Sequence, residues 1–377
     1  MAGYPERTHP ATGVHDPLYA TVLVLDSGAT TLALVSCDLQ EFVSARVGAE
    51  AREKFGVTLT ILSMSGTHAG PATADARPPW FTAAEDKIIA AIGEARKAEF
   101  PAELGVGTGR AYLAFNRRKV TDGHARTWWR NLEGAPSHPL DPTVNVIAIR
   151  QGQNVRAVLV NYAARATVLG PAITEFSADY PGAMRRTVEA QTSGALCLFV
   201  QGASGDISPY REREPGKLPA FDAMETMGRD LAAEVLRALA RLKPLPDPAQ
   251  PIRVATESLE VANRWQPLTR VPIGLAAGTI GGGLCFVAIP GEPFIEHQIT
   301  FQPRSECAFP LLFGSSYSGS GAWAGFLPTI RAATEGGEGA GYNTTVAVGT
   351  GEMLIDHGVV DLFKLRGLLH DLPDPRF

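Results

Sequence analysis

A serine, an aspartate and a histidine in two short glycine-containing segments are the residues of this chain best suited to acyl chemistry. Ser208 and Asp206 lie in the segment 201–210, directly after the apolar run 195–200, which predicts a buried strand opening into a turn. A serine becomes a useful nucleophile when a nearby base takes its proton. His68 could be that base, because an imidazole ordinarily titrates near neutral pH.

Three motifs resemble the neutral/alkaline ceramidases, a family of zinc-dependent amidases that split a fatty acyl amide. They are Gly-Thr-His-Ala-Gly-Pro at 66–71, Gly-Asp-Ile-Ser-Pro at 205–209 and Ile-Pro-Gly-Glu at 289–292. The resemblance covers roughly residues 10–345. It implies an α/β (mixed α+β) fold with mixed β-sheets flanked by helices, forming a single catalytic domain over residues 1–377 without the C-terminal immunoglobulin-like domain of longer ceramidases.

The resemblance also identifies four positions that hold zinc in the family, and they are occupied here by Gly66, Arg165, Glu292 and Gly337. Glycine offers no ligand atom and a guanidinium is always protonated, so only Glu292 could bind the metal. A zinc ion needs about three protein ligands. We therefore expect no zinc or other cofactor, and hypothesise that Arg165 and Glu292 form an ion pair where the metal would sit.

The family nucleophile corresponds to Ser208, and we expect Ser208, His68, Asp206 and Glu292 to be the catalytic residues. Without zinc, Ser208 and His68 with Asp38 or Asp206 as the acid would follow the logic of a serine hydrolase. The alternative interpretation is that Ser208 is a turn residue bonded to its own backbone before a proline.

Four residues are expected to bind substrate. Arg117 matches the family arginine that lines the substrate mouth, where it would hold a carboxylate or carbonyl oxygen. Arg165 would lie in the vacated metal position, and Asp38 at a strand end, where acids point into the crevice of such folds. Tyr342 is the tyrosine nearest to the last family ligand position.

Three functional hypotheses follow. The first is an enzyme without zinc that performs amide or ester chemistry, or an intramolecular cyclisation, on a small molecule of specialised metabolism. The second is a zinc-dependent amidase with rearranged ligands such as His68, Glu292 and Tyr342. The third is a non-catalytic protein that binds a small molecule in the same pocket.

Composition excludes several other classes of protein. The chain is 45% hydrophobic and 19% charged, with a net charge of −5, which is the balance of a soluble globular protein. The longest Lys/Arg run is the triplet 117–119, so a nucleic-acid partner is not expected. With neither a leader segment nor eighteen consecutive apolar residues, the sequence predicts a cytoplasmic protein without stable membrane insertion. Its oligomeric state is left open.

The four cysteines, Cys37, Cys197, Cys285 and Cys307, show no CxxC spacing. Three of them lie in or beside strand-like apolar runs, and a large cytosolic chain does not need cross-links. We therefore predict four buried free thiols.

Strand-like and helix-like segments alternate along the chain, which favours an α/β fold. Apolar runs predict strands at 19–25, 31–37, 58–64, 103–107, 144–150, 155–161, 252–261, 284–289 and 308–313. Helical spacing predicts helices at 41–55, from an N-cap at Thr82 to a point before Pro101, at 223–242 and at 293–302. The Pro-rich segment 245–251 is the strongest linker signal and the one place where the domain could be subdivided.

Overall fold

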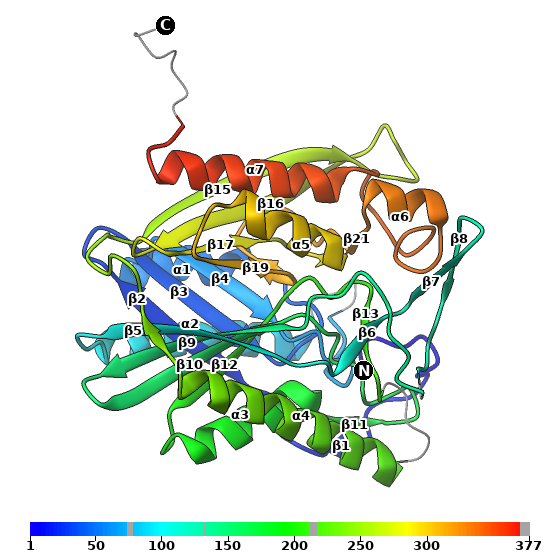
Figure 1. Ribbon diagram of the computed structural model, residues 1–377, viewed down its shortest axis with the longest axis horizontal. Helices are drawn as coiled ribbons and strands as arrows, with labels where there is room; N and C mark the ends of the chain where they lie inside the picture. Colours follow the sequence, from blue (N-terminus) through cyan, green and yellow to red (C-terminus); the bar gives the residue numbers. More distant parts are fainter. Residues whose placement is uncertain (74–77, 132, 212–216, 370–377) are drawn as a thin grey trace, which may run out of the picture.

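Three β-sheets enclose a common apolar core, and helices cover their outer faces (Figure 1). The computed structural model describes residues 1–73, 78–131, 133–211 and 217–369. In Figure 1, α7 (Thr350–Leu365) lies on the opposite side of the molecule from α3 (Asp179–Gln191) and α4 (Lys217–Leu239). The arrangement confirms the mixed α/β fold expected from the sequence.

The first sheet has the strand order β2-β3-β4-β20, and α1 and α2 cover its outer face. Strands β3 and β4 are parallel, whereas β2 and β20 are antiparallel to their neighbours. Its elements are β2 (Ala20–Asp26), β3 (Thr31–Cys37), β4 (Leu59–Met64), β20 (Ser316–Tyr317), α1 (Ala45–Phe55) and α2 (Pro79–Lys97).

The second sheet has the order β12-β10-β9-β5-β14 and is covered by α3 and α4. Strands β10 and β12 are parallel, and the remaining pairs are antiparallel. Its strands are β5 (Glu103–Arg110), β9 (Thr143–Gln151), β10 (Asn154–Tyr162), β12 (Leu196–Gln201) and β14 (Lys243–Pro244).

The third sheet has the order β15-β16-β17-β19, with α5 and α7 packed on its outer face. Strands β17 and β19 are parallel, and the other two pairs are antiparallel. Its elements are β15 (Arg253–Ala262), β16 (Arg270–Ile280), β17 (Leu284–Ala288), β19 (Phe309–Phe313) and α5 (Ile295–Arg304).

Short strand pairs and one short helix fill the region beyond the sheet ends. The pairs are β1 (Gly13–Val14) with β11 (Glu175–Phe176), β6 (Ala114–Asn116) with β13 (Ile207–Pro209), β7 (Arg118–Thr121) with β8 (His124–Thr127), and β18 (Glu292–Pro293) with β21 (Phe326–Leu327), and the helix is α6 (Ile330–Glu335).

The core follows from the alternation of side chains along each strand. In β3, Leu32 and Leu34 point into the apolar core shared by the three sheets, whereas Ala33 and Val35 pack under α1 and α2. Successive side chains of a strand point to opposite faces, so a strand covered on both faces is apolar throughout. This explains the near-continuous apolar runs from which the strands were predicted.

Two helices begin at residues other than those expected. Helix α1 begins at Ala45 rather than at 41, because the Ser44 hydroxyl accepts a hydrogen bond from the backbone N–H of Val47 and so caps the helix. Helix α2 begins at Pro79, one turn before the predicted cap at Thr82, since a proline fits the first turn of a helix.

The Pro-rich segment 245–251 lies against the shared core. Leu245 and Ile252, at its two ends, are both buried in the cluster formed by the three sheets, and the backbone N–H of Leu245 donates to the carbonyl of Leu104. The segment therefore connects the second and third sheets while packing on both. No helix among the described residues is long and apolar enough to cross a membrane.

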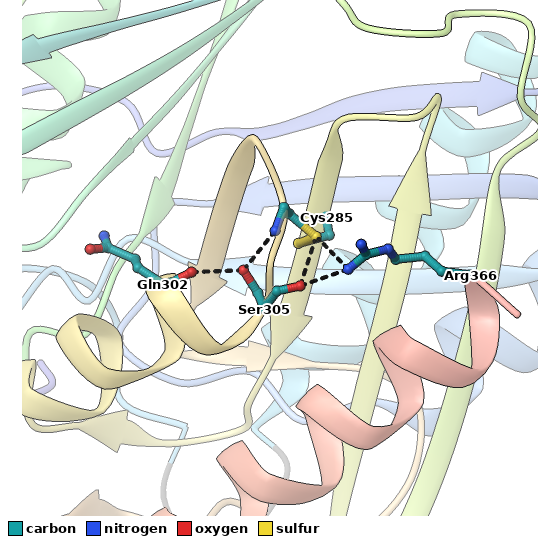
Figure 2. Close-up of a disulfide and its surroundings, with 5 residues drawn as sticks. Cys285, Gln302, Ser305 and Arg366 are labelled. Atoms are coloured by element: carbon teal, nitrogen blue, oxygen red, sulfur yellow. Dashed lines mark hydrogen bonds between the residues drawn. A yellow bond between two sulfur atoms is a disulfide. The ribbon is translucent and has the colours of Figure 1, made fainter. Parts of the chain in front are cut away.

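A disulfide joins Cys285 to Cys307, which corrects the prediction that all four cysteines are free thiols (Figure 2). Parallel pairing of β17 with β19 places Leu284 opposite Phe309 and so brings the two cysteines together across the α5 crossover. Their Cα atoms are 6.2 Å apart, within the range that a disulfide can span. Cys37 and Cys197 are free and buried, as predicted.

The disulfide should contribute measurably to stability, because it closes a loop between residues 22 apart in sequence. Cys307→Ser is expected to lower the free energy of unfolding by about 2–4 kcal/mol. The measurement is urea denaturation with and without reductant. Reductant should shift the wild-type midpoint and leave that of Cys307→Ser unchanged; a wild-type midpoint that ignores reductant would contradict the cross-link.

Asp179 should make stability depend on pH. It is fully buried at the start of α3, where it accepts backbone hydrogen bonds from Leu169 and Tyr180, and burial raises its pKa to about 7. The folded state then binds a proton that the unfolded chain releases near pH 4. Stability from this group is present below about pH 4 and is lost as the pH rises through about 7.

Asp179→Asn should therefore reduce the loss of stability between pH 5 and pH 8, measured as urea midpoints at both values. Asp141→Asn is the control. Burial alone would raise the pKa of Asp141, but hydrogen bonds from Thr143 and Gln298 lower it, so Asp141 stays ionised throughout this range. Equal pH slopes in wild type and Asp179→Asn would contradict the assignment.

Candidate active site

A small cavity lies where the carboxyl ends of parallel strands from the three sheets meet. Its lining includes two of the expected catalytic residues and one of the expected substrate-binding residues. The described residues that line it are Gln40, Gly66, His68, Arg165, Gln201, Ser204, Glu292 and Ser315.

Parallel strand pairing explains why these residues converge. Gln40 and His68 follow the parallel strands β3 and β4, Arg165 and Ser204 follow β10 and β12, and Glu292 and Ser315 follow β17 and β19. Parallel neighbours end at the same edge of a sheet, and in open α/β sheets that edge is where ligands bind. The three sheets thus each deliver a pair of loops to one place.

The Gln201 side chain ties these loops together. Its amide nitrogen donates to the carbonyls of Ser65 at 3.1 Å and Ala164 at 2.8 Å, which follow β4 and β10. Its own backbone carbonyl accepts from Gly314, at the end of β19, at 3.0 Å. One buried residue therefore satisfies backbone groups from loops of all three sheets.

Arg165 lies between His68 and Glu292. Its terminal nitrogen Nη2 is 3.0 Å from His68 Nε2, and its Nε is 3.7 Å from Glu292 Oε2. The Arg165 side chain is only 7% exposed and that of Glu292 is 15% exposed. The ion pair hypothesised from the sequence is present.

Contact with Arg165 fixes the tautomer of a neutral His68. A guanidinium can only donate, so Nε2 accepts and the ring proton lies on Nδ1. In this arrangement the Nε2 lone pair is already engaged, and His68 would have to release Arg165 before that nitrogen could take a proton from a substrate or serine.

Glu292 is suited to hold or move a proton. Burial raises the pKa of its carboxyl, and the positive charges of Arg165 and Arg117 oppose the rise. Glu338, which forms an ion pair with Arg117 at 3.3 Å, raises the pKa of Glu292 further. A carboxyl held in this balance can act as a general base or acid.

The segment 2–7 packs against the far side of His68. The Tyr4 ring meets the imidazole edge-on at 4.9 Å between centroids, and Arg7 donates to the His68 carbonyl. Gly3 has a φ of +88°, and a Cβ at this position would overlap the imidazole. His68 is thus held between this segment and Arg165.

Ser208 and Asp206 do not line the cavity. Ser208 lies in β13, opposite Phe115 of β6, and its hydroxyl is buried without a hydrogen bond to any described residue. Asp206 accepts hydrogen bonds from Asn116 at 2.7 Å and from the backbone of Ile295 at 2.8 Å, and burial raises its pKa. These two contacts give Asp206 a structural role at the start of α5.

The remaining predicted site residues also lie outside the cavity lining. Asp38 forms a buried ion pair with Arg185 at 2.8 Å, and burial raises its pKa while Arg185 opposes the rise. Arg117 is almost completely buried and pairs with Glu338. Tyr342 is 51% exposed on the last glycine-rich loop.

The donors of the cavity do not fit a zinc ion. They include one imidazole and one carboxylate, and both face the permanent positive charge of Arg165. Gly66 and Gly337, at two of the positions that hold zinc in the family, have no side chain to bind a metal. Among the described residues, no three His, Cys, Asp or Glu side chains are grouped so as to hold a metal.

Sequence reasoning missed four lining residues: Gln40, Gln201, Ser204 and Ser315. Three are two or three residues beyond the end of a parallel strand, and Gln201 is the last residue of one. The strands were recognised, but their parallel pairing was not. Ser204 lies in the same glycine-rich segment as Ser208, but sequence reasoning selected Ser208 and did not name Ser204 as a site residue.

Comparison with solved structures shows the fold. A crystal structure of neutral ceramidase from Pseudomonas aeruginosa matches with a TM-score of 0.75 and 16% identity, over 96% of this chain and 72% of that chain. A ceramidase complexed with C2 matches with a TM-score of 0.78 and 15% identity, over 97% of this chain and 73% of that chain. No protein-family model and no curated protein sequence matches. The chain therefore has a ceramidase-like fold.

The contact between Gly3 and His68 can be tested with a matched pair of variants. Gly3→Ala should displace the imidazole or release the segment 2–7, lowering the free energy of unfolding by about 1–3 kcal/mol from overpacking. It should also speed modification of His68 by diethyl pyrocarbonate, followed by peptide mass spectrometry. Gly28→Ala is the control, because Gly28 has the same φ of +88° and nothing lies within 4 Å of its Cβ position.

If both variants lose the same stability and leave the modification rate of His68 unchanged, the segment does not hold the imidazole.

Proposed function

We propose that the protein is a hydrolase-type enzyme that performs acyl chemistry on an amide or ester of a small molecule, with the positive charge of Arg165 serving where ceramidases use zinc. The observation that carries the proposal is the position of Arg165, held in the cavity between His68 and Glu292. The ceramidase-like fold supports a relationship to hydrolases.

Arg165 suits the stabilisation of a developing negative charge. When a nucleophile attacks an acyl carbon, the carbonyl oxygen becomes an oxyanion, and a preorganised positive donor lowers the barrier. The guanidinium is fixed by its side-chain partners. The backbone N–H of Arg165 also donates to the carbonyl of Ile207 at 3.0 Å. It requires no reorganisation and no change of protonation during the reaction.

Glu292 would move the proton. Its carboxylate accepts a proton from the attacking group and later returns it to the leaving amine or alcohol. Burial raises the pKa of this carboxyl, which favours its taking up a proton during the reaction. His68, bonded to Arg165 through Nε2, orients the guanidinium.

Intramolecular cyclisation is the form of this chemistry that the burial of the site favours. His68, Arg165 and Ser204 are each less than about a tenth exposed, so little water reaches them. A substrate that carries its own nucleophile would then compete well with hydrolysis. We propose a small molecule of specialised metabolism as the substrate and the cytoplasm as the location.

The two other hypotheses have less support. A zinc amidase built from His68, Glu292 and Tyr342 would need the half-exposed Tyr342 to reach a cavity that it does not line. A non-catalytic binding protein is favoured by one observation, the pairing of Arg165 with both His68 and Glu292, which engages all three side chains with one another. The following experiment separates these alternatives.

Arg165→Gln is expected to reduce turnover on the order of 10²- to 10³-fold, the usual cost of removing an oxyanion donor. The measurement is turnover of a panel of activated esters and acyl amides by purified protein after dialysis against a chelator. Wild-type turnover should survive the chelator. Metal analysis of the same sample should show far less than one zinc per chain.

Arg185→Gln is the matched control, because Arg185 is an equally buried arginine in an ion pair with a carboxylate outside the cavity. It should lose stability and keep its turnover. Near-stoichiometric zinc with chelator-sensitive activity would support the zinc amidase instead. A panel in which no ester or amide is turned over would support the binding protein.

A further inference from the structure

Ser204 and Ser315 are the two serines among the described residues that line the cavity, together with Arg165 and Glu292, whereas Ser208 does not line it. Ser208 has no solvent exposure. It lies in β13, which pairs with β6, and its hydroxyl is buried. A nucleophile has to approach the reacting carbon to about 3 Å, so a place at the cavity wall favours Ser204 over Ser208.

The Ser204 hydroxyl is also available. It forms no hydrogen bond with any residue that the structure describes, and the Ser204 backbone N–H likewise donates to none of them. The Ser208 hydroxyl is unpaired as well, so it is the position of Ser204 at the cavity wall that distinguishes the two serines.

The turn that carries Ser204 is rigid. Gly205 donates to the carbonyl of Pro293 at 2.9 Å, and Ala203 donates to the Gln298 side chain at 2.9 Å. Any Cβ at Gly205 would collide with the carbonyl of Glu292, and one at Gly202 would lie 2.7 Å from Gln298 Oε1. Glycine at both positions thus lets the serine turn press against the segment that carries Glu292.

We propose that Ser204, in place of Ser208, is the nucleophile that forms an acyl intermediate in this cavity; the proposal rests on the acyl chemistry proposed above. Ser204 Oγ attacks the acyl carbon, and its proton passes to the Glu292 carboxylate. Arg165 stabilises the oxyanion. The bond from the acyl carbon to the leaving nitrogen or oxygen then breaks, and Glu292 returns the proton to the leaving group.

The acyl–Ser204 ester is resolved by a second nucleophile. Water, or an amine or hydroxyl elsewhere on the substrate, attacks the acyl carbon while Glu292 takes its proton. The ester bond to Ser204 breaks, and Ser204 Oγ recovers a proton from Glu292. Attack by water gives the free acid, and attack by an internal nucleophile gives a ring. In both cases Ser204 and Glu292 return to their starting states.

The test uses the full chain with a fluorophosphonate probe. The probe phosphonylates activated serines with loss of fluoride, so the substrate need not be known. Peptide mass spectrometry of labelled wild type should place the probe on Ser204. Ser204→Ala should lose the label and reduce any turnover on the order of 10³-fold or more, whereas the matched Ser208→Ala should keep both. A label on Ser208, or none on either serine, overturns the proposal.

Accessibility supplies a second measurement that does not depend on catalysis. Ser204→Cys should react with iodoacetamide in the folded protein, and Ser208→Cys should not. The two native free thiols are buried and serve as unreactive references. Equal reactivity at the two positions counts against Ser204.

If the panel of esters and amides is turned over by wild type and equally by Ser204→Ala, the Ser204 assignment fails while the acyl chemistry stands. If nothing is turned over, the acyl chemistry itself fails.

Discussion

The structure depends on bringing the carboxyl ends of three parallel strand pairs to one buried place. Strand ends carry backbone groups that must be paired when water is excluded. Here the Gln201 side chain supplies much of that pairing, since it bonds loops after β4 and β10 while its backbone meets the end of β19. The three sheets are therefore locked together at the cavity rather than only through the apolar core behind it. This is why residues more than two hundred positions apart, such as Gln40 and Ser315, share one wall.

A buried guanidinium occupies that place. Removing a charge from water is costly unless the charge is paired and hydrogen-bonded. Arg165 meets that requirement with Glu292, His68 and the Phe326 ring, whose centre is 5.5 Å from the guanidinium carbon. The same contacts remove the two best metal ligands from use, so accommodation of arginine and binding of zinc are alternatives at this site. Positive φ at Gly66 and Gly337 fits the same outcome, because the loops turn there without a side chain that could reach back to a metal.

Much of the fold could be predicted from the sequence, and most of the cavity could not. Apolar runs gave β3, β9 and β10 to within a residue or two, because strands covered on both faces are apolar throughout. Strand β16 was missed: its central stretch 274–278 reads Gly-Leu-Ala-Ala-Gly, and glycine and alanine are uncommon in strands. The Arg165–Glu292 pair was predicted through resemblance to a family. Ser204 and the Cys285–Cys307 disulfide were not, because both depend on which strands lie parallel, and a local pattern carries no information about that pairing.

Two arginine–glutamate pairs share one aromatic ring, and this arrangement ties the proton on Glu292 to charges beyond the cavity. Arg117 lies over Phe326 at 5.6 Å, nearly the same distance as Arg165, and pairs with Glu338. Each pair is close to neutral when both carboxyls are ionised, so protonating Glu292 leaves Arg165 with an uncompensated charge beside the substrate. In the proposed reaction, that charge would appear when the carbonyl oxygen turns negative. Proton uptake by Glu292 and stabilisation of the oxyanion by Arg165 would then be coupled through one ion pair.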